Sequence, residues 1–191
     1  MAIRSFAFSA GSPALNFVDT MARRRDTPHD LLPDPPDLTR WLKACDFGAP
    51  MVGGDIKVPQ EQCAAARDLR EAIHRVLDAA LQDTAPDEAD VLHINTWAAA
   101  PGLRPQFIDG AVHVTAAEPI YAALATIAAD AVHLMDADTL PTLRRCPECG
   151  MLFKDKSRPQ KRVWCSSASG CGNRAKVRRH RARQRKPEAK T

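Results

Sequence analysis

The chain has 191 residues, of which 45% are hydrophobic and 26% charged, with a formal net charge of +4. This length accommodates one ordinary domain with its own core and one small module that needs a cross-link such as a bound metal ion. It excludes a third domain. Because Ala, Leu, Val and Ile dominate the hydrophobic fraction, the composition favours packed helices over a β-sandwich.

The first 25 residues predict a strand followed by a helix. Residues 5–11 alternate two phenylalanines with small residues, which is typical of a short strand. Ser12 can cap a helix and Pro13 suits its first position, so an amphipathic helix is expected over 12–25. The arginines at 23–25 would then complement the helix dipole, or alternatively contact a phosphate backbone.

The rest of the first 136 residues predicts a mainly helical body. Further helices are expected in residues 37–45, with Asp37 as cap, and in 59–81, 86–100 and 118–135. Asp109 and Gly110 separate two short β-prone runs and predict a hairpin with a primed turn. The fold class is therefore α+β, mainly helical, with a small β-hairpin.

The body contains few residues that suggest chemistry. It has no Gly-rich phosphate loop, no nucleophile elbow and no paired-histidine metal motif. Catalysis is not expected, and an enzymatic body with a targeting appendage is the weaker alternative. Asn16 and Asp19 are the candidates for a ligand pocket, unless they face solvent. Cys45 and Cys63 stand alone and are interpreted as buried thiols.

Charge is distributed very unequally along the chain. Residues 144–191 hold 16 Lys or Arg against three acids, whereas residues 1–143 hold 11 against 20. The C-terminal end is thus strongly cationic, whereas the preceding body is acidic. This asymmetry predicts a polyanionic partner. No apolar run reaches the roughly 18 residues that cross a bilayer, so we expect a cytoplasmic protein without membrane association.

Four cysteines near the C-terminus have the spacing of metal ligands. Cys146 and Cys149 form a Cys-x2-Cys pair, and Cys165 and Cys171 follow as Cys-x5-Cys. In a reducing compartment such clusters are metal sites more often than disulfides, and four thiolates suit one tetrahedral, structural Zn²⁺. We expect a hairpin in which residues 151–153 pair with 163–164 to bring the two pairs together.

Other interpretations of the cysteines are weaker. A thioredoxin-like redox site needs an amphipathic helix after Cys149, and the segment that follows is Met-Leu-Phe-Lys. A catalytic zinc needs an open coordination position, which four cysteines close. His180 is a possible substitute ligand, but it lies nine residues beyond Cys171.

The segment after Cys171 predicts a basic helix. Its arginines at 174, 178, 181 and 185 share one helical face, and like charges at this spacing repel one another. Anchoring at Cys171 and a bound polyanion would stabilise the helix, whereas the alternative is a disordered basic tail. The candidate nucleic-acid contacts are Lys161, Arg162, Arg174, Lys176, Arg178, Arg179, Arg181, Arg183 and Arg185.

These residues carry a resemblance to known families. Cys171-Gly172-Asn173-Arg174, behind Cys146, Cys149 and Cys165, resembles the CGNR zinc finger. Residues 13–20 and 38–42 are similar to the ABATE domain that precedes this finger in bacteria. The resemblance implies a stress-related transcription regulator, with the four cysteines as zinc ligands and a finger that binds DNA.

These observations predict a two-part protein. The expected parts are an ABATE-like domain (1–136), a linker (137–143), a treble-clef-like or zinc-ribbon-like module of a hairpin plus basic helix (144–187), and a tail (188–191). Duplex DNA is the expected partner, with RNA or a ribosome as the alternative. The N-terminal domain is expected to sense a small-molecule effector or to form a homodimer.

Overall fold

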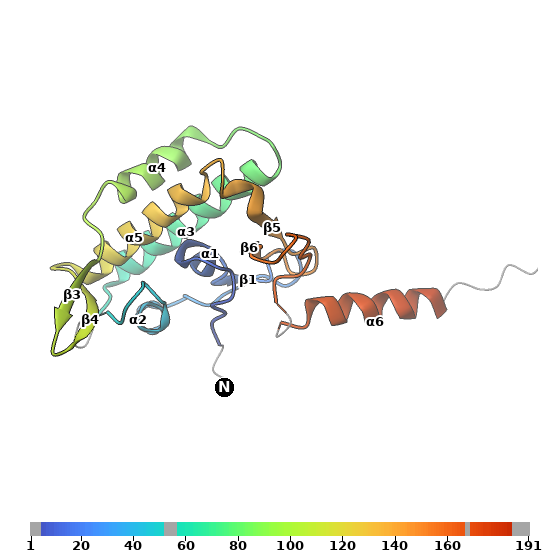
Figure 1. Cartoon of the computed structure of the whole chain (residues 1–191), viewed down its shortest axis with the longest axis horizontal. Helices are drawn as coiled ribbons and strands as arrows, with labels where there is room; N and C mark the ends of the chain where they lie inside the picture. The colour runs from blue at the N-terminus through green and yellow to red at the C-terminus, as the bar shows by residue number, and fades with distance from the viewer. Residues whose placement is uncertain (1–4, 52–56, 167–168, 185–191) are drawn as a thin grey trace, which may run out of the picture.

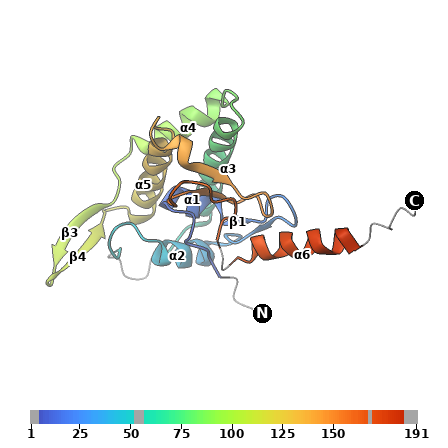
Figure 2. The same cartoon turned by 45° about the vertical axis from the view of Figure 1, so that its right-hand side comes forward.

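The computed structural model describes residues 5–51, 57–166 and 169–184. A helical body is joined to a small C-terminal module, from which the last helix projects (Figures 1 and 2). Within the described ranges, no helix combines the length and apolar character that a bilayer span requires.

Three long helices make the centre of the body. Helices α3 (Gln60–Leu81), α4 (Glu88–Ala98) and α5 (Pro119–Leu134) pack against one another, and α1 (Pro13–Val18) lies against α3 and α5. Helix α2 (Pro35–Ala44) contacts α3. Trp41, Phe17 and Ile73 are fully buried where these elements meet. The amphipathic periodicity that predicted α3, α4 and α5 is therefore confirmed.

Two predictions for the N-terminal segment are wrong. Residues 5–11 form no strand; the Ala10 amide donates instead to Asn16 Oδ1 at 3.0 Å. Ser12 does cap α1, but the helix ends at Val18 instead of continuing to residue 25. The Thr20 hydroxyl donates to the Phe17 carbonyl at 2.6 Å, and the chain then enters strand β1 (Met21–Ala22). Hydrogen bonds between side chains and the backbone thus take the place of the backbone–backbone hydrogen bonds that a longer helix or a strand would form here.

Two short hairpins complete the body. Strand β1 pairs with β2 (His29–Asp30), and β3 (Arg104–Ile108) pairs with β4 (Ala111–Thr115). The second hairpin confirms its prediction, because Asp109 and Gly110 both adopt the positive φ angles of a primed turn, 49° and 81°. Helix α2 begins at Pro35, two residues before the expected cap at Asp37.

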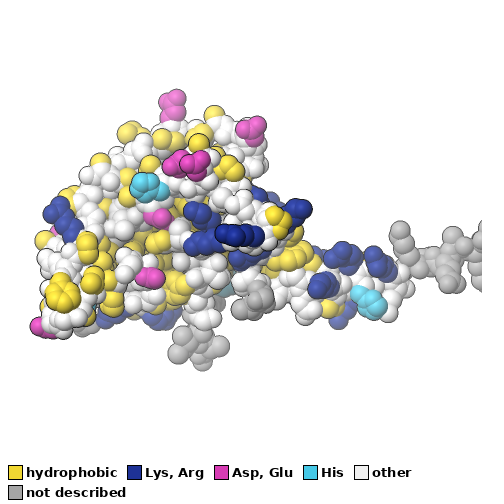
Figure 3. All heavy atoms as spheres, viewed as in Figure 1, with side chains coloured by type: hydrophobic (Ala, Val, Ile, Leu, Met, Phe, Trp, Pro, Cys, Tyr) yellow, Lys and Arg dark blue, Asp and Glu magenta, His cyan; other side chains and the backbone are white. Residues whose placement is uncertain are grey.

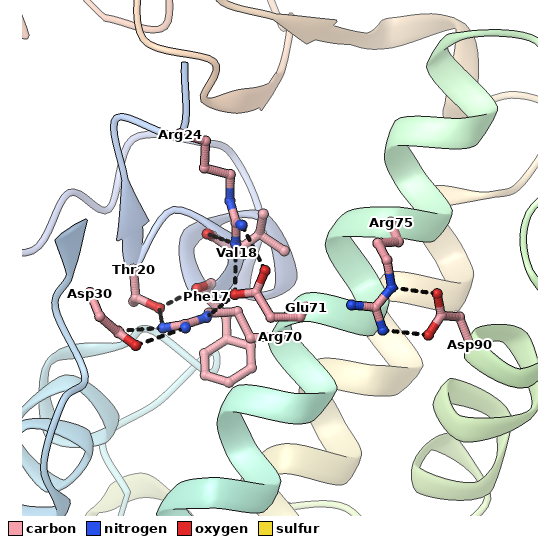
Figure 4. A network of polar contacts seen from close by, with 9 residues as sticks. All are labelled: Phe17, Val18, Thr20, Arg24, Asp30, Arg70, Glu71, Arg75 and Asp90. Carbon is pink, nitrogen blue, oxygen red and sulfur yellow. Dashed lines mark hydrogen bonds and ion pairs between the residues drawn. The ribbon is translucent and has the colours of Figure 1, made fainter. Parts of the chain in front are cut away.

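A buried ionic network joins α3 to the β1–β2 hairpin (Figure 4). The Arg70 side chain is 2% exposed and donates to both carboxylate oxygens of Asp30, at 2.6 and 2.9 Å. Arg70 Nε and Arg24 both donate to Glu71. Each buried charge therefore has a partner of opposite sign, as burial of charged groups requires.

The C-terminal module consists of a hairpin and a helix. Strand β5 (Leu143–Arg145) pairs with β6 (Leu152–Lys154), and α6 (Cys171–Gln184) follows. The expected pairing of residues 151–153 with 163–164 is wrong. The Cys-x2-Cys turn is itself the hairpin turn, so the strands that flank it pair with each other.

The module packs on the body. Phe153 and Leu143 belong to the same buried hydrophobic cluster as Phe17. The Lys154 amide donates to the Ala10 carbonyl at 2.7 Å, and Arg145 forms an ion pair with Asp78 of α3. The segment predicted as a linker contains a short 3-10 helix, Leu140–Thr142. These contacts orient the module relative to the N-terminal helices.

Candidate metal centre and nucleic-acid interface

The β5–β6 turn presents the first two cysteines. The Cys146 amide donates to the Met151 carbonyl, and the Gly150 amide donates back to the Cys146 carbonyl, both at 2.9 Å. Gly150 has φ 81°, a left-handed conformation that a residue with a side chain rarely adopts. This tight turn directs the Cys146 and Cys149 thiols to the same side.

The other two cysteines complete a compact cluster. Cys171 is the first residue of α6, and Cys165 precedes it. The four Sγ atoms all lie within 4.8 Å of one another, with 3.7 Å between Cys149 and Cys165 and 3.6 Å between Cys165 and Cys171. Tetrahedral Zn²⁺ with Zn–S bonds of ~2.3 Å requires S–S distances of about 3.8 Å. The donor set and its spacing therefore fit one zinc ion.

Hydrogen bonding favours the thiolate form of one cluster cysteine, Cys165. A hydrogen bond from Cys149 lowers the pKa of Cys165 to about 5, and the same bond raises the pKa of Cys149. Arg174 Nη2 donates to Cys171 Sγ at 3.0 Å. Because four thiolates around Zn²⁺ carry a net charge of −2, this guanidinium offsets part of the negative charge.

An ordered loop links β6 to the second pair of cysteines. Asp155 is 1% exposed, and its carboxylate accepts hydrogen bonds from Ser157 and from the Arg162 amide. The Arg162 guanidinium stacks over Phe153 at 4.6 Å, and its Nε donates to the Trp164 carbonyl. Arg162, a predicted nucleic-acid contact, is thus already engaged within the module.

The Gly172 backbone lies against an aromatic ring. A Cβ atom at this position would lie 3.0 Å from Trp164 Cδ1 and 3.2 Å from its Nε1. The indole therefore packs directly on the first turn of α6. This contact gives a steric reason for glycine immediately after the last zinc-binding cysteine.

Glu148, which the sequence interpretation overlooked, connects the first cysteine pair to α6. Its carboxylate accepts two hydrogen bonds from Arg178, at 2.8 and 2.5 Å, and lies 3.7 Å from Arg174 Nε. Arg178 holds the pKa of Glu148 below its usual range. An acid placed between the cysteines of a module rich in arginine is the sequence signal that could have revealed this contact.

The predicted nucleic-acid contacts divide into two sets. Arg174 and Arg178 face the zinc centre and Glu148. Among the described acids, none forms an ion pair with the exposed side chains of Lys161, Lys176, Arg179, Arg181 and Arg183. Lys176, Arg179 and Arg183 follow i, i+3, i+7 and share a face roughly opposite Arg174 and Arg178. Arg185 lies outside the described residues.

Comparison with protein families agrees with this geometry. The CGNR zinc finger model matches residues 142–184, which include all four cysteines. A second model, ABATE, described as "putative stress-induced transcription regulator", matches residues 11–138. The chain belongs to the ABATE family. No curated protein matches the chain.

The CGNR finger of this ABATE protein holds one structural Zn²⁺ through Cys146, Cys149, Cys165 and Cys171. His180, the alternative ligand, is exposed on α6 beside Gln184 and outside the cluster. All four coordination positions have a sulfur donor, so the ion serves to fix the root of α6 to the β5–β6 turn.

The two candidate pocket residues of the ABATE domain have different surroundings. Asn16 accepts a hydrogen bond from the Ala10 amide and stabilises the N-terminal segment. Asp19 lines a crevice of about 570 Å³ between domain and finger, together with Arg23, Cys149 and Arg174. Burial raises the pKa of Asp19 to about 7, and the nearby Cys165 charge adds to the shift. Asp19 thus lies at the junction of the two parts.

Proposed function

We propose that this protein is a zinc-dependent transcription regulator that binds duplex DNA through α6. The main support is that, in the described part of the chain, α6 is held along its first two turns, by Cys171, Arg174, the Trp164 ring and the Arg178–Glu148 pair. The remainder projects away from the body (Figures 1 and 2). Its free cations are thus presented at a defined angle.

The dimensions and charge of α6 suit the DNA major groove. The helix has 14 residues and is ~21 Å long, and the major groove admits one α-helix. Figure 3 shows Lys and Arg side chains over the module and along α6. Arginine binds phosphate or guanine through two parallel hydrogen bonds, which favours a fixed contact over diffuse attraction.

The aromatic residues of the module favour duplex over single-stranded nucleic acid. Single strands are bound by stacking bases on exposed aromatic rings. Phe153 is fully buried, and the Trp164 indole packs on Gly172. Phe153 therefore offers no face for stacking, and the Gly172 backbone covers part of the Trp164 ring. Effector binding and dimerisation by the ABATE domain stay predictions.

The test begins with selection of bound sequences from random duplexes. The affinity for the selected duplex is then measured at salt concentrations from about 50 to about 300 mM, because the slope of log affinity against log salt reports the number of phosphate contacts. If the five cations described above without an ion pair each contact one phosphate, the slope of log affinity against log salt concentration should be about −4.5. Replacing Lys176, Arg179 and Arg183 together by glutamine should reduce the magnitude of that slope by about 2.7. The matched control replaces Lys43 and Arg104, two exposed cations of the body, and should leave it unchanged.

The outcome that contradicts DNA binding is a slope near zero for every duplex. Tighter binding to structured RNA than to any selected duplex, at the same salt concentration, would identify RNA as the partner instead.

A further inference from the structure

The turn between β1 and β2, residues 23–28, carries three consecutive arginines with different environments. Arg24 is directed into the body, where its guanidinium donates to both Glu71 oxygens at 2.7 and 3.0 Å (Figure 4). Its side chain is only 17% exposed. This pair anchors the turn, while Arg23 and Arg25 on either side are exposed.

Arg25 lies across the first zinc-binding turn. A Cβ atom at Gly150 would lie 2.9 Å from Arg25 Cγ, so the aliphatic stem of Arg25 covers the Gly150 backbone. Burial lowers the pKa of Arg145, and the nearby positive charge of Arg25 lowers it further. Arg25 therefore belongs spatially to the finger, although it is supplied by the ABATE domain.

Arg23 lies next to the root of α6. It lines the same crevice as Cys149 and Arg174, and its charge acts on Glu148. The chain around β1 lies on the side of the body that carries the module in both cartoon views (Figures 1 and 2). The turn and α6 thus flank the first cysteine pair.

The charge of this surface has little internal compensation. Arg23 forms an ion pair with Asp26, but Arg25 has no ion pair with any acid in the described part of the chain. Glu148, the acid of the adjacent zinc-binding turn, is bound to Arg178. Like charges so arranged repel one another, and a polyanion relieves this repulsion.

We propose that Arg25 is a nucleic-acid contact that the ABATE domain supplies beside the finger. This inference rests on the proposed function of α6. While α6 occupies the major groove, Arg25 binds a phosphate of the adjacent backbone through its guanidinium. Because the module and the body share one hydrophobic core, this second contact sets the direction in which the duplex crosses the finger.

The experiment uses the full, zinc-loaded chain and the duplex that α6 selects. Arg25→Gln keeps an aliphatic stem over Gly150 but removes the charge. One lost phosphate contact should weaken binding about fivefold at 0.15 M salt and reduce the log–log slope by about 0.9. Arg104→Gln, an exposed arginine on β3, is the matched control and should change neither quantity. Arg25→Lys should restore the slope, because it retains one positive charge.

Zinc content and melting temperature are measured for each variant. If Arg25→Gln loses zinc, Arg25→Lys must still match the wild-type slope, and failure to do so overturns the inference. If the wild type binds DNA and the α6 triple variant weakens it, but Arg25→Gln behaves like Arg104→Gln, the inference is wrong while the proposed function stands. If the wild type binds no duplex, the proposed function itself fails.

Discussion

Glu148 and Arg178 are 30 residues apart and form an ion pair with two hydrogen bonds, Nη1–Oε1 at 2.8 Å and Nη2–Oε2 at 2.5 Å. Glu148 lies between two zinc ligands, and Arg178 lies in the second turn of α6. Zinc and the Trp164 indole hold the helix at Cys171 and Gly172, and attachment within the first turn leaves the helix axis free to tilt. The ion pair supplies an attachment one turn further along the helix that restrains this motion.

Replacing Glu148 by glutamine should therefore loosen α6 without removing zinc. We expect one zinc per chain, but faster amide hydrogen exchange in residues 173–184, because the charged hydrogen bonds to Arg178 are weakened. Glu61→Gln, an exposed acid of α3, is the control. Unchanged protection of α6 in the Glu148 variant would show that the pair does not restrain the helix.

Loss of one zinc ligand should affect the whole protein. Cys165→Ala removes a thiolate from the cluster, and we expect zinc per chain to fall well below one by metal analysis. Since Cys165 and Cys171 belong to the common hydrophobic core, the melting temperature of the body should fall as well. Cys45→Ala, a buried thiol outside the cluster, should leave the zinc content unchanged. Full zinc retention in Cys165→Ala would contradict the assigned ligand set.

Gly172→Val tests the contact between α6 and Trp164. The added side chain would have to enter space that the indole occupies, because Trp164 Cδ1 lies 3.0 Å from where the first side-chain carbon would stand. Overpacking of this kind typically costs about 1–3 kcal/mol. We expect weaker zinc retention in competition with a chelator, compared with Gly110→Val, where nothing lies within 4 Å of the Cβ position but the turn conformation is strained. Equal zinc affinity in the two variants would show that packing of Trp164 on Gly172 does not contribute to zinc retention.

The buried network predicts a large effect for one acid and a small effect for another. Asp30→Ala removes the bidentate partner of buried Arg70 and should cost about 3 kcal/mol in the free energy of unfolding. Asp37→Ala removes the partner of Arg40, whose side chain is 46% exposed and stays hydrated, and should cost less than about 1 kcal/mol. Denaturant titration measures both values, and similar costs would mean that the Arg70 pair contributes no more than a surface pair.

His74 predicts a loss of stability in weak acid. Burial lowers the pKa of His74 from 6.5 to about 4, with a further contribution from Arg24. Between these two values the unfolded chain binds a proton that the folded chain does not, so stability falls as the pH decreases from about 6.5 to 4. Because the group is partly exposed, we expect a loss of about 1–2 kcal/mol. His74→Gln should flatten this part of the pH profile; an unchanged slope would exclude His74 as the titrating group.

Much of the fold follows from local signals in the sequence. Apolar residues at three- and four-residue steps predicted α3, α4 and α5, and Asp109-Gly110 predicted the β3–β4 turn. The spacing of the four cysteines also identified the zinc ligands. Such signals operate within a few turns of chain, where side-chain periodicity and turn conformation depend on neighbouring residues.

Only the tertiary structure decided how these elements meet. Strand β6 pairs with β5 and not with residues 163–164, because the zinc-binding turn closes the shorter loop. The Glu148–Arg178 pair, and the position of Arg25 over Gly150, join residues distant in sequence. Composition and spacing determine that a basic helix follows a zinc site. Which of its charges stay free depends on long-range contacts, since an arginine bound to an internal acid is no longer available to a phosphate.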